Sequence, residues 1–160
     1  MVRPVVLAMV IADHVYQDRK SGKSVIAGTF TKIIFQPLLE QPPEDKEKNS
    51  SPDPSKGHPA VFSMGSPHMY LALTGIRKEL ELDIRLMDLA DARVLMEGGL
   101  PIKVEDANPI AVHEYAVPLP RLPLPRKSGN YSIDVLWNGE QLASWRIDAT
   151  MTKPDQPTEP

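Results

Sequence analysis

The side chains best suited to chemistry in this sequence are its histidines, one of which follows an aspartate. Asp13 and His14 come directly after the apolar run from Val5 to Ala12, at the end of an expected strand. No two histidines stand two or four residues apart, the spacings that place a metal-binding pair on one strand or one helix face. A zinc or iron site would have to combine them with His68 or His113 from neighbouring strands, as compact β-barrel enzymes do. The simpler interpretation is a solvated strand end.

Acidic residues suggest a second kind of metal site, the loop that holds calcium in some sandwich proteins. Asp88 and Asp91 fall in an expected turn, with Glu97 beyond it. Asp83 alternates onto the solvent face of the preceding strand and so points away from that turn. Two carboxylates are too few for a cation that takes about six to eight oxygen ligands. A polar turn is therefore the simpler interpretation.

Motifs for nucleophilic or phosphate chemistry are missing from the sequence. It contains no G-x-S-x-G, no phosphate-binding loop and no G-x-G-x-x-G. It also has no cysteine, which excludes disulfides, thiolate catalysis and cysteine-based zinc sites. A pair of carboxylates assembled by folding, as in glycosidases, would leave no mark in the sequence. The sequence therefore favours binding over catalysis, with no cofactor.

Composition and charge narrow the class of protein. The chain has 160 residues, 41% of them apolar and 24% charged, which fits one soluble domain that folds without disulfides or a metal. A formal net charge of -3 gives no broad attraction to phosphate, so nucleic acid is not an expected partner. The run from Val5 to Ala12 is too short to cross a bilayer and lacks a signal-cleavage site. We expect a cytoplasmic protein that binds no membrane.

Alternation of apolar and polar residues predicts strands rather than helices. The clearest strand runs from Leu80 to Leu86, where every second residue is Leu or Ile and the intervening residues are charged. The stretch from Met69 to Ile76 precedes it and is predicted to pair with it through a turn at Arg77 to Glu79. At the N-terminus, Val5 to Tyr16 and Val25 to Phe30 predict a hairpin around a polar loop.

The C-terminal part carries the best hairpin signal. Apolar residues alternate from Tyr131 to Trp137 and again from Ala143 to Ala149. Between them stand Asn138 and Gly139, which both tolerate the positive φ of a type I′ turn. With further short strands elsewhere, the sequence predicts an all-β, Ig-like antiparallel β-sandwich of about seven to nine strands.

Glycines suggest where strands end or bend. Gly28 is expected to mark a bulge in its strand. Gly98 and Gly99 are expected to end a short strand at Val94 to Met96. Further strands are expected at Ile102 to Val104 and at Ile110 to Val117, and a helical turn at Phe35 to Leu39 or at Asp88 to Val94.

The 17 prolines divide the chain. Residues 1–152 are predicted to form one domain, in which Gln41 to Pro59 is a flexible inserted loop, because it contains no large apolar residue. Residues 153–160 are predicted to be a disordered tail. The segment from Val117 to Arg126 contains P-x-x-P and is either a ligand for a proline-binding groove or a stiff crossover between two sheets. We favour the crossover.

Two resemblances follow from these motifs. Gly129, Tyr131 and Ile133 resemble the tyrosine corner of immunoglobulin-like domains, where a tyrosine two residues after a glycine opens a late strand. The chain from about residue 5 to 150 also resembles an uncharacterised bacterial family of small stand-alone Ig-like sandwich proteins, a domain of unknown function. That resemblance implies a β-sandwich and supplies no activity and no catalytic residues. Its motifs are Ala12-Asp13, Gly22, Ile26-Ala27-Gly28-Thr29-Phe30, Leu122-Pro123-Leu124-Pro125, Gly129-Asn130-Tyr131 and Asn138-Gly139.

Three functions compete on this basis. The favoured one is a binding or protein-interaction module, with an unknown protein partner or a second copy of itself paired through an edge strand. The second is a small metal-dependent enzyme that uses histidines and an aspartate at strand ends. The third is a carbohydrate- or peptide-binding accessory domain, in which Trp137 and Trp145 would stack on a ligand if they were exposed.

Overall fold

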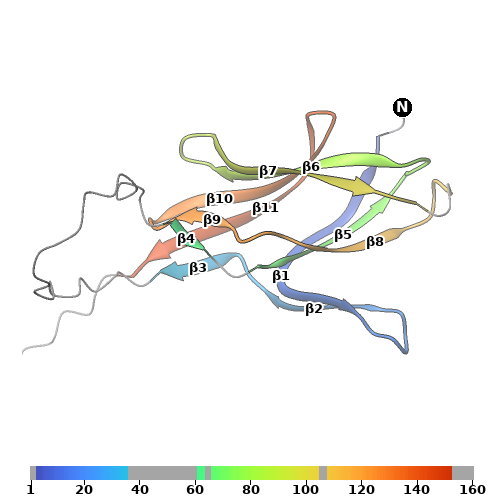
Figure 1. The fold of residues 1–160 in the computed structure, drawn as a ribbon, viewed down its shortest axis with the longest axis horizontal. Coiled ribbons are helices and arrows are strands. Elements are labelled where there is room, and N and C mark those ends of the chain that lie inside the picture. The colour runs from blue at the N-terminus through green and yellow to red at the C-terminus, as the bar shows by residue number, and fades with distance from the viewer. Residues whose placement is uncertain (1–2, 36–60, 64–65, 105–107, 153–160) are drawn as a thin grey trace, which may run out of the picture.

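A computed structural model gives the fold and describes residues 3–35, 61–63, 66–104 and 108–152. The predicted loop at Gln41 to Pro59 and the predicted tail lie outside these residues. The described residues form eleven strands (Figure 1). These are β1 (Val5–Gln17), β2 (Ser24–Thr29), β3 (Lys32–Phe35), β4 (Val61–Ser63), β5 (His68–Thr74), β6 (Leu80–Asp88), β7 (Arg93–Ile102), β8 (His113–Pro118), β9 (Pro123–Pro125), β10 (Gly129–Trp137) and β11 (Glu140–Met151).

The strands form a sandwich, which confirms the predicted all-β class. One sheet has the order β2-β1-β5-β8 and the other β3-β11-β10-β6-β7, while β4 and β9 make a separate pair. Every pairing is antiparallel except that of β3 with β11. Eleven strands exceed the predicted number because β3, β4 and β9 are only three or four residues long. The edge strands are β2 and β8 in the first sheet and β3 and β7 in the second.

The core lies between the two larger sheets. In β6 the residues at every second position are buried, as the alternation in the sequence predicts. The Pro-rich segment after β8 runs from one sheet toward the other and inserts its leucines into the core, which agrees with the favoured crossover. Those leucines are Leu119, Leu122 and Leu124, at 4%, 0% and 0% exposure.

Four expectations about local structure and pairing are wrong. Strands β5 and β6 do not pair, because β5 lies between β1 and β8 while β6 lies between β10 and β7. Gly98 and Gly99 do not end a strand, since β7 continues through both in register with β6. The β1–β2 register is continuous on both sides of Gly28, so the bulge is absent there. No helix occurs among the described residues, so Asp88 to Val94 forms no helical turn.

The predicted C-terminal hairpin is confirmed. Trp137 pairs with Glu140, and the two residues between them, Asn138 and Gly139, have φ of 50° and 79°. Both values are positive, as a type I′ turn requires.

Gly139→Ala is expected to lower the free energy of unfolding by about 1–2 kcal/mol, because the positive φ at this position is unfavourable for a residue with a Cβ. Urea unfolding followed by tryptophan fluorescence measures the loss. Asn138→Gly serves as the control and should stay close to wild type, because glycine adopts the same φ freely. A Gly139→Ala protein as stable as wild type would contradict the turn assignment.

The N-terminal hairpin forms an arm against its own sheet. Figure 1 shows that β1 bends strongly, so that its second half and β2 turn back beneath the four-stranded sheet. The Ser24 hydroxyl near the tip of the arm donates to the Glu114 carboxylate of β8 at 2.5 Å. Val15, Ala12 and Ala72 are buried although none belongs to the main core cluster. The arm therefore adds a third layer over part of the sheet.

Candidate functional site

The candidate metal ligands are only partly brought together. The rings of His14 and His68 lie 6.1 Å apart between centroids. His68 Nδ1 lies 3.0 Å from the backbone oxygen of Asp13, while the Asp13 carboxylate lies beside Gly28 on the other face of the arm. His113 stands opposite Leu73, at the other end of β5. No cluster of three or more metal-ligating side chains occurs in the part of the chain that the structure describes.

Both tryptophans belong to the core hairpin. Trp137 is 9% exposed, and Trp145 is partly buried against the core with its Nε1–H donated to the Phe30 carbonyl at 2.9 Å. Trp137 is thus covered by the core, while Trp145 is held in place and stays partly exposed. The carbohydrate- or peptide-binding alternative stays a prediction.

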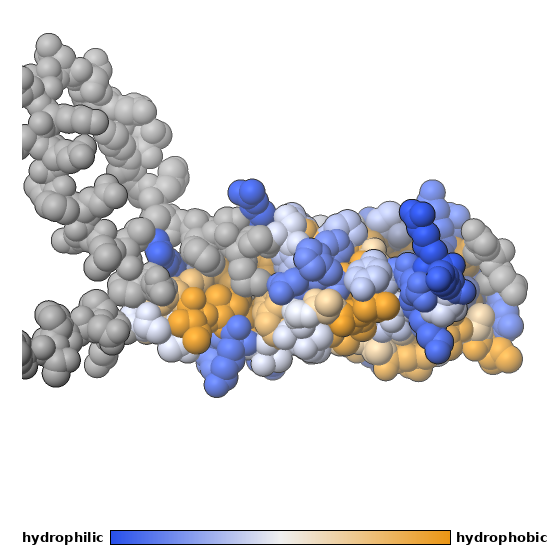
Figure 2. All heavy atoms as spheres, turned by 90° about the horizontal axis from the view of Figure 1, so that it is seen from below, coloured by the Kyte–Doolittle hydropathy of each residue, from blue (hydrophilic) through white to orange (hydrophobic). Residues whose placement is uncertain are grey.

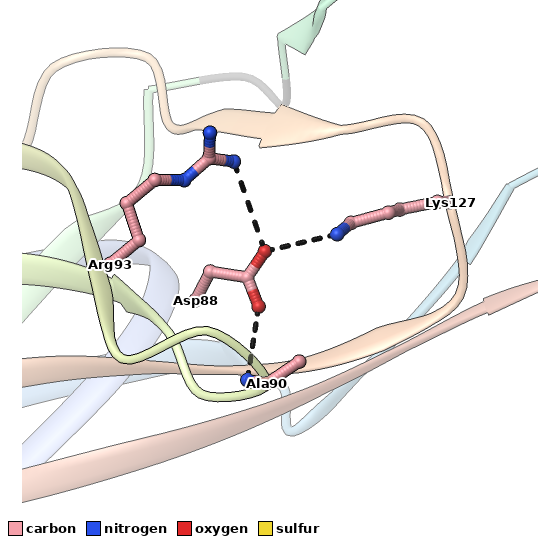
Figure 3. A network of polar contacts seen from close by, with 4 residues as sticks. All are labelled: Asp88, Ala90, Arg93 and Lys127. Carbon is pink, nitrogen blue, oxygen red and sulfur yellow. Dashed lines mark hydrogen bonds and ion pairs between the residues drawn. The ribbon is translucent and has the colours of Figure 1, made fainter.

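Asp88 occupies an unexpected place for a residue of a polar turn. It is 1% exposed, because it continues the core-facing alternation of β6 by one more position. Its Oδ1 accepts a hydrogen bond from the Ala90 amide at 3.1 Å (Figure 3). Its Oδ2 lies 3.1 Å from Lys127 Nζ and 4.0 Å from Arg93 Nη2. The carboxylate is thus tied to the β6–β7 turn and to the loop before β10.

The charges around Asp88 decide its protonation. Burial acts to raise the pKa of Asp88, but Lys127, the Ala90 amide and Arg93 outweigh it and hold that pKa below its usual range. The carboxylate is therefore ionised at neutral pH. Lys127 and Arg93 are about half exposed, so water reaches them while the acid stays covered. This arrangement closes one end of the sandwich.

Tyr131, which pairs with Asp88 across the β6–β10 ladder, is fully buried. Its ring packs against Gly129, where an added Cβ would lie 3.1 Å from the hydroxyl oxygen. The glycine of the G-x-Y motif therefore makes room for the ring. The Tyr131 hydroxyl has no hydrogen-bond partner among the described residues, so the bond that defines a tyrosine corner is absent there. The immunoglobulin-like relationship stays a prediction.

An apolar hollow lies at the open edge of the sandwich. Gly98 pairs with Ile84 of β6, which is 6% exposed, so position 98 faces the core between Met96 and Leu100. An atom at the Cβ position of Gly98 would meet nothing within 4 Å. The missing side chain leaves a hollow of about 130 Å³. Its lining comes from β6, β7 and the start of the Pro-rich segment: Ile84, Met96, Glu97, Gly98, Gly99, Leu100, Val117, Pro118, Leu119 and Pro120.

The size and lining of this hollow define what fits it. A cavity of about 150 Å³ lined by aliphatic residues is large enough for benzene. The one charged residue of the lining, Glu97, is bound by Arg85 at 2.7 Å. The hollow therefore suits one large apolar side chain. Two adjacent glycines in a predicted strand are the signal that would have pointed to it, because glycine in a strand often marks a close backbone approach.

A larger and shallower depression of about 620 Å³ runs along β10 and β11. Lys32, Arg146 and Asp148 lie in its lining together with Trp145. Opposite charges alternate there, so no single ligand chemistry follows from it.

A second apolar surface lies at one end of the four-stranded sheet. Val5 pairs with Thr74, whose hydroxyl donates to the Ala111 carbonyl at 3.0 Å, so β1 and the segment before β8 meet around Thr74. Figure 2 shows the molecule from below the view of Figure 1, where apolar and strongly hydrophilic residues lie side by side on the surface. The exposed apolar residues of this surface are Val5, Leu7, Ile110 and Val112, at 51%, 53%, 83% and 55%.

Comparison with known proteins adds no relative: no protein-family model matches the chain, and no curated protein matches it. The part of the chain that the structure describes contains no helix able to cross a membrane. The fold and the hollow at Gly98 therefore carry the functional interpretation.

Proposed function

We propose that this protein is a non-catalytic interaction module that receives an apolar side chain of a protein partner in the hollow at Gly98. Within this proposal it is a cytoplasmic, immunoglobulin-like member of the bacterial family that its sequence resembles. The observation that carries the proposal is the open Cβ position of Gly98 on the core-facing side of an edge strand. A strand that served only packing would gain stability from a side chain at that position.

Selection from a random peptide library tests the proposal. Peptides that bind the wild-type protein should share a large apolar residue and should lose binding to Gly98→Val, which fills the hollow. Val94→Thr is the matched control, because Val94 is 44% exposed in the same strand and does not line the hollow. Failure to enrich any peptide, or binders that recognise Gly98→Val as well as wild type, would refute the proposal.

The surface around Thr74 supports a second candidate function, association of two copies. The charged residues beside it, Glu114 and Arg3, are bonded within the chain to Ser24 and Glu140. A group of exposed apolar residues marks a protein contact more often than a single exposed apolar residue does.

Leu7→Asp is therefore expected to shift the protein toward monomer, because it places a charge in that apolar contact. Size-exclusion chromatography with light scattering over a wide concentration range measures the mass. Ile34→Asp is the control, since Ile34 is 68% exposed in β3 of the other sheet and should leave the association unchanged. A wild-type protein that stays monomeric at every concentration removes this candidate.

A further inference from the structure

Strand β7 is an unpaired sheet edge, and it borders the hollow along its length. Among the described residues it pairs with β6 on one side and with no strand on the other, where β9 lies near it without pairing. The opposite wall of the hollow does not pair with it either, because the Leu119 amide donates to the Pro67 carbonyl at 2.9 Å. An edge strand presents unused N–H and C=O groups to whatever lies beside it.

The residues of β7 make its main chain easy to reach. Gly98 and Gly99 face opposite sides of the sheet, and neither carries a side chain over the backbone. Pro101 follows two residues later and has no N–H, so it bounds the stretch that a new strand could pair with. The accessible stretch is therefore Met96 to Leu100, the same residues that line the hollow.

We infer that β7 accepts an extended segment of another protein by strand addition, with one aromatic side chain of that segment seated in the hollow. This inference rests on the proposed function and names its ligand class. Main-chain hydrogen bonds supply affinity in this mode of binding, and the side-chain pocket supplies specificity. Met96 favours an aromatic occupant, because a thioether makes favourable contacts with ring edges.

The charge at the rim adds a preference to the ligand class. Arg121 directly follows Pro120 in the wall of the hollow, is exposed, and has no ion-pair partner among the described residues. A carboxylate two residues from the aromatic one lies on the same face of the added strand and would meet this guanidinium. An exposed pair of this kind changes affinity by about twofold to fivefold.

Nuclear magnetic resonance titration with three synthetic peptides tests the inference on the full chain. The first is the capped peptide Thr-Val-Phe-Thr-Asp, the second has Gly in place of Phe, and the third is the first with alternate peptide nitrogens methylated. The first should shift the amides of Met96 to Leu100 and protect some of them from hydrogen exchange. The second and third should each bind at least tenfold more weakly, and Gly98→Val should not bind the first.

Each of the other possible results contradicts one specific claim. If the first and third peptides bind equally well in the hollow without protecting β7, strand addition is wrong and the proposed function stands. If the first peptide shifts no residue of the hollow, both are wrong. Arg121→Glu should weaken the first peptide twofold to fivefold and favour a variant with Lys in place of Asp. If Arg121→Glu bound the Asp peptide and the Lys peptide with equal affinity, the preference for an acidic ligand would be wrong.

Discussion

Asp88→Asn is expected to lower the free energy of unfolding by about 1.5–3 kcal/mol at pH 7, the usual worth of hydrogen bonds and contacts made by a charged group. Asparagine keeps the shape of the side chain and can still accept from the Ala90 amide, so the loss reports the charge. What disappears is the attraction of Lys127 and Arg93 for a carboxylate that is 1% exposed.

The pH dependence of this loss has a definite sign. The folded protein holds the pKa of Asp88 below its usual value, so the unfolded chain takes up the proton first as the pH falls. The stabilising contribution is complete above the unfolded pKa of about 3.9 and is lost as the pH falls through the lower folded pKa. The difference between wild type and Asp88→Asn should therefore be constant from pH 7 to 5 and shrink below pH 4.

Urea unfolding of both proteins at several pH values, followed by tryptophan fluorescence, measures this difference. Asp91→Asn is the matched control, because Asp91 lies in the same turn and is exposed. It should change the free energy of unfolding by less than about 0.5 kcal/mol. If Asp88→Asn lost as much stability at pH 3 as at pH 7, the ionised carboxylate would not be the source.

The sequence was sufficient for the local parts of the fold. Asn138-Gly139 determines its own turn, and the alternation in β6 predicts which residues are buried, since both depend on neighbouring residues only. The pairing of β5 with β6 was wrong because alternation shows that one face is buried but not which sheet buries it. The five residues from Gly75 to Glu79 carry the chain to the other sheet instead of closing a hairpin.

The candidate site was less predictable. Gly98 and Gly99 have low strand propensity, and their strand persists because the ladder with β6 holds it, a tertiary effect that overrides propensity. Asp88 did leave a signal, because it continues the even-numbered positions of β6 that carry Leu and Ile. The prediction of a solvated turn residue was wrong because the position of Asp88 in the alternation, and not its charge, determines its burial. The lysine that pairs with it stands far away in the sequence, at position 127.

Gly98→Val is expected to make the protein more stable while removing its binding activity. Replacing glycine by alanine in a strand gains about 0.5–1 kcal/mol, and each further methyl group buried in the hollow adds up to about 0.8 kcal/mol. The open space around the Cβ position and the volume of about 130 Å³ leave room for valine without overpacking. A substitution that fills a packing defect raises stability without affecting function. If Gly98→Val raises stability and also removes binding, the hollow is a binding site.

The measurement compares the free energy of unfolding and peptide affinity across substitutions at two positions of β7. Gly98→Ala and Gly98→Val should raise stability in that order, with binding weakened most in the valine protein. Val94→Thr should show neither effect, because Val94 is 44% exposed and lies outside the lining of the hollow. If Gly98→Val lowered stability, the hollow would be too narrow for an aliphatic side chain. An aromatic residue of a partner would then not fit it either, so this one measurement limits both the proposed site and its ligand.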